Sequence, residues 1–122
     1  MVIFDTNAIL RYILQDNQTM ADAVELQLSD QVCYVPVEVV CEIVYVLSNV
    51  YGLERSIIAQ TLTKIADVYN ITFAKKAVVL YAFQVYSSTK LDFVDCLLTG
   101  YAKKEGNAIF TFDKKLQNYL KK

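Results

Sequence analysis

Five acidic residues of this chain stand where an acid either caps a helix or binds a metal. They are Asp5, Glu42, Asp92, Asp95 and Asp113. The chain has no histidine, which excludes Ser-His-Asp and Cys-His catalysis and histidine-bound zinc. Clustered carboxylates without histidine suit the hard cations Mg²⁺ and Mn²⁺. Two such ions can activate a water and stabilise the leaving oxygen in an attack on phosphorus.

Two of these acids close apolar runs that predict buried strands. Asp5 follows residues 2–4, and Asp113 follows residues 108–112. Ligands of parallel sheets bind beyond the carboxyl ends of the strands, so the two carboxylates are expected side by side. Three polar neighbours are expected to orient ligands or hold waters: Thr6, Asn7 and Thr111.

The other three acids lie on predicted helices. Glu42 stands in a long apolar helix, 37–49, where a buried acid is costly unless it is paired or metal-bound. Asp92 and Asp95 open the helix 92–105 and share a face. Asp92 suits the N-cap, whereas Asp95 precedes an apolar run in which an uncompensated charge is expensive.

Each acid also has a structural interpretation. Asp5 and Asp113 can cap the helices that follow them, and Glu42 can face solvent. Asp92 with Asp95 can form a box-like cap. Four acids at the strand ends or helix starts of one sheet are nevertheless more than we expect from coincidence.

The elements that must position these acids alternate between strand and helix. This alternation predicts one α/β domain, residues 1–122, with a mainly parallel sheet and helices on both faces. The further strands are expected at 32–35 and 70–73, and the further helices at 18–29, 57–68, 74–87 and 114–120. Helices 37–49 and 74–87 carry surplus apolar surface, including Tyr45, Tyr81, Phe83 and Tyr86, which predicts a homodimer.

Composition narrows the class further. Apolar residues make up 55% of the chain, which argues against disorder, and no apolar run is long enough for a membrane span. We expect no signal peptide, and the three cysteines form no CxxC pair, so we expect reduced thiols in the cytoplasm. Residues 1–54 carry a net charge of −7 and residues 55–122 one of +6. The basic half offers a flank for phosphates, although solvated faces are the simpler interpretation.

The order of these motifs resembles that of a PIN-domain ribonuclease. The matching stretches are Asp5-Thr6-Asn7, Pro36 with Glu42, Asp92 to Leu98, and Thr111-Phe112-Asp113. The small size resembles the VapC-type toxins of toxin–antitoxin pairs. The resemblance implies a three-layer α/β/α sandwich with a central sheet of four to five strands. A fifth strand after the helix 114–120 is not evident, and Thr99-Gly100 stand where small alanines are common.

The resemblance also implies a function. The implied protein is a Mg²⁺- or Mn²⁺-dependent endoribonuclease whose metal-binding acids are Asp5, Glu42, Asp95 and Asp113. Such proteins are usually dimers, cut RNA, and are inhibited by an antitoxin whose C-terminal segment fills the active-site groove. The alternative is a non-catalytic module that keeps the fold and binds only a protein partner; the complete acid set argues against it.

Overall fold

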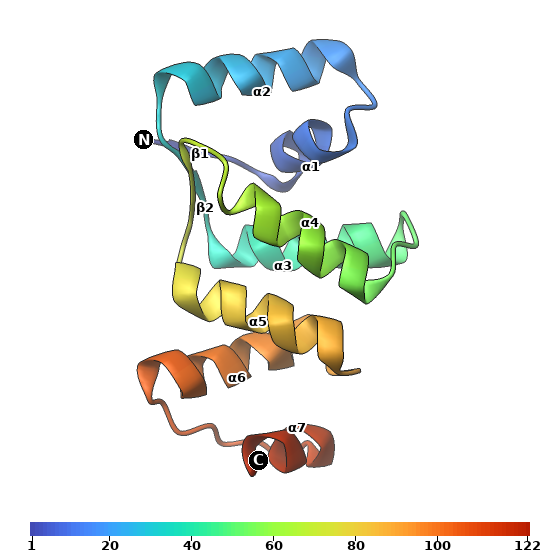
Figure 1. Ribbon diagram of the computed structural model, residues 1–122, viewed down its shortest axis with the longest axis vertical. Helices are drawn as coiled ribbons and strands as arrows, with labels where there is room; N and C mark the ends of the chain where they lie inside the picture. The colour runs from blue at the N-terminus through green and yellow to red at the C-terminus, as the bar shows by residue number, and fades with distance from the viewer.

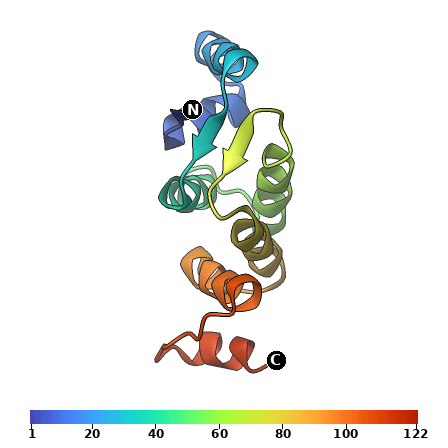
Figure 2. The ribbon, with the colours of Figure 1, turned by 90° about the vertical axis from the view of Figure 1, so that its left-hand side faces the viewer.

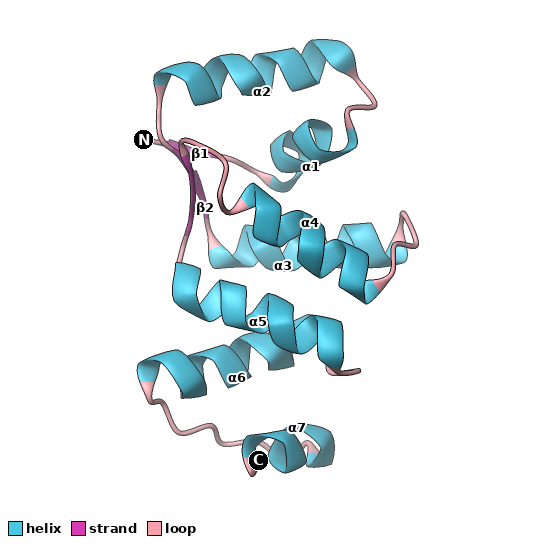
Figure 3. Cartoon of the chain, in the orientation of Figure 1, coloured by secondary structure: helices cyan, strands magenta, loops and turns pink.

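The computed structural model describes all 122 residues, as a three-stranded parallel sheet with seven helices. Figures 1 and 3 show the elements along the chain. They are β1 (Val2–Ile3), α1 (Thr6–Leu14), α2 (Gln18–Asp30), β2 (Cys33–Val35), α3 (Val37–Asn49), α4 (Arg55–Ile65), β3 (Ile71–Phe73), α5 (Lys76–Ser88), α6 (Phe93–Glu105) and α7 (Lys114–Leu120). None of the helices is long and apolar enough to cross a membrane.

The helix boundaries follow from short polar residues and glycine. Asp5, Asn17 and Asp113 each accept the backbone N–H three residues further on, at 2.9–3.0 Å, and so begin α1, α2 and α7. Gly106 ends α6 in the left-handed region, with φ of 71°. α4 begins two residues earlier than expected, after Glu54, where no side chain caps the helix.

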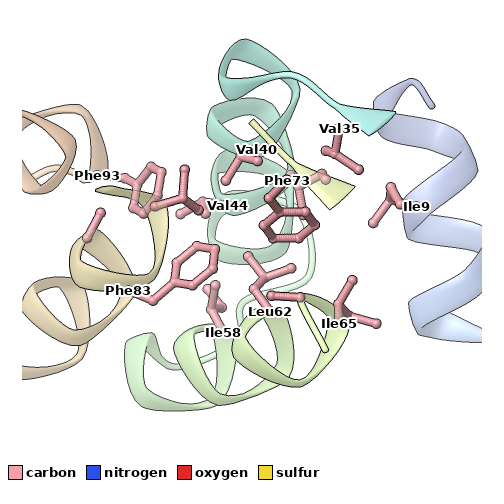
Figure 4. Packing of buried hydrophobic residues seen from close by; sticks show 14 of the residues in the cluster. Ile9, Val35, Val40, Val44, Ile58, Leu62, Ile65, Phe73, Phe83 and Phe93 are labelled. Atoms are coloured by element: carbon pink, nitrogen blue, oxygen red, sulfur yellow. The ribbon is translucent and has the colours of Figure 1, made fainter. Parts of the chain in front are cut away.

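The sheet has strand order β1-β2-β3 and is covered on one face. Alternate side chains of β2 and β3 are buried, among them Val35 and Phe73, and so is Phe4, which directly follows β1. Figure 4 shows apolar side chains of α3 and α4 around Phe73. Residues Ile3, Tyr34 and Thr72 lie level with one another on the opposite face, where Ile3 is 67% exposed.

The C-terminal helices continue away from the sheet. Figures 1 and 2 show α5, α6 and α7 succeeding one another, so that α7 lies at the opposite end of the molecule from β1 and α2. α6 is closely fitted to α5: the ring of Phe93 stacks on that of Phe83, with centroids 5.7 Å apart. The Cα of Gly100 lies so close to Val78 that an added Cβ would be 2.6 Å from the Val78 carbonyl oxygen.

The α/β class and the parallel sheet are confirmed, but the strand count is three instead of four to five. The strand predicted at 108–112 is wrong: the segment between α6 and α7 has no secondary structure (Figure 3). A strand exists only through hydrogen bonds to a neighbour. This segment follows α6 to the far end of the molecule, where no strand is available. Ile3 and Thr72, on the other face of the sheet, are exposed.

The surplus apolar surface expected on α5 is mostly used within the chain. Phe83 is 1% exposed and Tyr86 4% exposed, because α6 packs on both rings. Tyr45 on α3 remains 64% exposed. The burial of Phe83 and Tyr86 removes part of the sequence argument for a dimer.

Candidate functional site

Three of the candidate acids line one cavity at the starts of α6 and α7. The cavity has a volume of about 260 Å³. Its lining is almost entirely charged, with three carboxylates facing three ammonium groups: Asp92, Asp95 and Asp113 with Lys90, Lys114 and Lys115. A site with this lining can hold a cation against the carboxylates and a phosphate against the lysines.

Asp95 is the most electrostatically perturbed of these acids. Partial burial raises its pKa, and the negative charges of Asp113 and then Asp92 raise it further. Asp113 is held in place from two directions. Its carboxylate caps α7 by accepting the Leu116 N–H at 3.0 Å, and its own N–H donates to the Thr111 hydroxyl at 3.0 Å. The crowding of like charges at Asp95 is what a bound cation would relieve.

Asp92 occupies the N-cap position of α6, but its side chain makes no capping hydrogen bond. The prediction that its carboxylate takes the free amides of the first turn is therefore wrong, and the box-like arrangement with Asp95 does not form. Its side chain lines the charged cavity instead. Loss of this carboxylate should consequently cost little stability.

Asp5 and its neighbours lie elsewhere, at the carboxyl end of β1. Asp5 is exposed and caps α1 by accepting the Ala8 N–H at 2.9 Å. Thr6 is 8% exposed, and its hydroxyl oxygen is buried without a hydrogen-bond partner. Asn7 is exposed. A buried hydroxyl without a partner is uncommon, and this one lies next to an exposed carboxylate at the end of β1.

Glu42 is exposed on α3, as its structural interpretation foresaw. Its neighbour Cys41 lines a second cavity, of about 420 Å³, together with Tyr45, Arg55 and Asp92. The helix that carries Glu42 therefore faces the start of α6, although Glu42 itself is not part of that lining.

The structure does not gather the predicted acids into one metal site. No group of three His, Cys, Asp or Glu side chains lies close enough to hold an ion. The donor type fits Mg²⁺ or Mn²⁺, since every candidate ligand is a carboxylate. The acids divide into a C-terminal set around the cavity (Asp92, Asp95 and Asp113) and two acids outside it, Asp5 after β1 and Glu42 on α3.

Sequence reasoning missed the cationic half of the cavity and one structural arginine. Lys90, Lys114 and Lys115 lie within two residues of a candidate acid, and that adjacency was a usable signal. Arg55 gave none, because its partners are more than thirty residues away. Its Nε donates to the Tyr86 carbonyl at 2.8 Å, another guanidinium nitrogen donates to the Leu91 carbonyl, and the group lies 3.7 Å from the Tyr86 ring centre.

The parallel sheet and the acids at strand and helix starts define a class, and comparison with known proteins identifies it. The family model described as PIN domain matches residues 2–122, so this chain belongs to the PIN domain family. The chain is similar to the VapC ribonuclease of Aquifex aeolicus (strain VF5), with 28% identity over 110 residues, which cover 87% of this chain and 82% of that protein. No solved structure matches this chain. The resemblance to PIN-domain ribonucleases of VapC type is therefore confirmed.

Proposed function

We propose that this protein is a Mg²⁺- or Mn²⁺-dependent endoribonuclease that acts as the toxin of a toxin–antitoxin pair. The observation that carries the proposal is the charged cavity, where three acids and three lysines meet at the starts of α6 and α7. Membership of the PIN domain family and the similarity to a VapC ribonuclease support the same activity.

Each residue has a defined role in this proposal. Asp5, Glu42, Asp95 and Asp113 would hold the cation, which would supply a more acidic water and neutralise charge on the phosphate. Thr111 fixes the backbone of Asp113. Lys90, Lys114 and Lys115 attract the RNA backbone to the carboxylates. Asp92, Thr6 and Asn7 orient ligands or waters around the ion.

The proposal also covers the binding partners, the oligomeric state and the cellular compartment. The substrate is RNA, the inhibitor is a cognate antitoxin protein, the working form is a homodimer, and the compartment is the cytoplasm. An antitoxin that inserts its C-terminal segment must bring groups that match the charges of the cavity. A reading frame for a small DNA-binding protein beside this one would support the pairing.

The alternative, a non-catalytic module that binds a protein partner, has one observation in its favour. Asp5 lies apart from Asp95 and Asp113, and no three acids are placed to hold an ion. A module of this kind would bind neither Mn²⁺ nor RNA in a manner that depends on these carboxylates.

A cleavage assay separates the two functions. The purified protein should cut structured RNA in Mg²⁺ or Mn²⁺, stop in EDTA, and resume when the metal is restored. Asp95→Asn should abolish cleavage, whereas the matched control Glu25→Gln, an exposed acid of α2, should cut like the wild type. Cleavage at the same positions in EDTA, or undiminished cleavage by Asp95→Asn, would refute the metal mechanism.

A further inference from the structure

The turn between α5 and α6 carries two side chains of the charged cavity. Lys90 and Asp92 both line it, and they stand on either side of the buried Leu91. Asp92 begins α6 without a capping hydrogen bond from its own side chain. Its carboxylate is therefore not held in place by the helix that it begins, and the contacts of its chain neighbours decide where it points.

Arg55 holds the residue before Asp92. Its guanidinium donates to the Leu91 carbonyl. That carbonyl shares a planar peptide group with the nitrogen and Cα of Asp92, so a donor on its oxygen restricts the rotation of the whole plane. The Leu91 N–H is held separately, by the Thr89 hydroxyl at 3.2 Å. The peptide groups on both sides of Leu91 are thus fixed before the chain reaches Asp92.

Arg55 also supports the residue after Asp92. Its guanidinium carbon lies 3.7 Å from the centre of the Tyr86 ring. The Tyr86 ring meets the ring of Phe93, the first residue of α6, in an edge-to-face arrangement with centroids 5.7 Å apart. A cation on a ring face and an edge-to-face pair are both attractive contacts. The two chain neighbours of Asp92 therefore depend on the same arginine.

A third contact anchors Arg55 to the end of α5. Its Nε donates to the Tyr86 carbonyl at 2.8 Å. Tyr86 lies in the last turn of α5, where the carbonyls have no partner within the helix. A positive charge at this end also interacts favourably with the helix dipole. One side chain from the first residue of α4 thus joins the end of α5 to the start of α6.

We infer that Arg55 is a positioning residue for the proposed metal site: it fixes the turn between α5 and α6 so that Asp92, and Asp95 one helical turn further on, meet at the charged cavity. Arg55 does not line that cavity, so it acts through the turn and not on the ion or the RNA. The inference rests on the proposed function for the metal, whereas the hold on the turn is measurable without it.

The test compares two variants of α4. Arg55→Lys keeps the charge, but an ammonium cannot contact two carbonyls and a ring together. Leu62→Ala is the matched control, because Leu62 is fully buried on the same helix and its truncation lowers stability through a cavity, without removing any contact of Arg55.

Two quantities are measured without RNA. The first is Mn²⁺ affinity, read from the electron paramagnetic resonance signal of the free ion. The second is hydrogen exchange of the Leu91 and Cys96 amides, followed by NMR. The Leu91 amide donates to the Thr89 hydroxyl, and the Cys96 amide donates to the Asp92 carbonyl at 3.0 Å. These amides therefore report on local opening of the turn and of the first turn of α6.

Arg55→Lys should speed the exchange of both amides and weaken Mn²⁺ binding about tenfold, as expected when a group that orients the ligands is lost. RNA cleavage should then need more Mn²⁺ than in the wild type. Leu62→Ala should keep the wild-type Mn²⁺ affinity and the wild-type exchange of the two amides. Unchanged exchange in Arg55→Lys, unchanged Mn²⁺ affinity, or an equal loss of affinity in Leu62→Ala would each overturn the inference.

The proposed function and the inference fail in different ways. A wild type that neither binds Mn²⁺ nor cuts RNA refutes the proposed function, and the inference with it. A wild type that does both, beside an Arg55→Lys protein that binds Mn²⁺ equally well, leaves the proposed function in place and overturns the inference alone.

Discussion

Gly100→Ala tests how firmly α6 is held against α5. The glycine lies within α6, and a Cβ at this position would be 2.6 Å from the Val78 carbonyl oxygen and 3.0 Å from its Cγ1. The oxygen belongs to the backbone of α5 and cannot rotate away. One of the two helices must therefore shift when the methyl group is added.

Two opposing effects set the magnitude. Alanine is favoured over glycine inside a helix by about 1 kcal/mol. Overpacking of a close contact costs about 1–3 kcal/mol. Since the closest atom is backbone, we take the upper part of that range and expect a net loss of about 1–2 kcal/mol in the free energy of unfolding.

The assay is urea unfolding, which compares the free energies of unfolding of the variant and the wild type, provided that their m-values agree. In a Val78→Ala background, Gly100→Ala should cost less than it does in the wild type, because Cγ1 is gone while the carbonyl remains in place. Gly106→Ala is the control: nothing lies within 4 Å of its added Cβ, but φ of 71° should cost about 1–2 kcal/mol through backbone strain alone. A Gly100→Ala protein more stable than wild type would show that α6 does not approach α5 as described.

Three further predictions concern individual side chains. Asp95→Asn should raise stability at pH 7, because the raised pKa of Asp95 means that the native state penalises the ionised acid. The gain, measured by urea unfolding, should vanish as the pH falls below the ordinary value of 3.8, and a gain that persists there would contradict this reasoning. Arg55→Lys should lower the free energy of unfolding in urea by about 1.5–3 kcal/mol, because an ammonium cannot contact the Tyr86 and Leu91 carbonyls and the Tyr86 ring together as the guanidinium does. A variant as stable as the wild type would contradict this geometry. Burial raises the pKa of the Cys96 thiol to about 11, so iodoacetamide at pH 8 should label the half-buried Cys41 first, as read by mass spectrometry; faster labelling of Cys96 would show that α6 opens.

Local signals predicted most of the helices correctly. The periodic apolar residues placed α3 and α6 with little error, and Asp5 and Asp113 cap the helices that follow them. Gly106 directly follows the predicted end of the helix 92–105 and caps α6. These features depend on neighbours within one or two turns, which a sequence displays directly.

Features that depend on distant partners were not predictable in this way. The run 108–112 has the composition of a strand, but whether it becomes one depends on a neighbour that the chain itself does not bring to it. The sequence displays the order of the candidate acids, but whether they gather depends on where α6 lies relative to β1, so their assignment stays a prediction. Arg55 was missed because its three contacts, to Tyr86 and Leu91, join segments far apart in sequence.

The central claim is that carboxylates of the charged cavity hold the metal of a ribonuclease, and RNA cleavage across a Mn²⁺ titration tests it most directly. The wild type and the control Glu25→Gln, an exposed acid of α2, should cut RNA as the metal is added. Asp95→Asn, which loses one carboxylate of the cavity, should not cut at any metal concentration. Cleavage by Asp95→Asn at the wild-type rate, or cleavage by the wild type without metal, would contradict the claim.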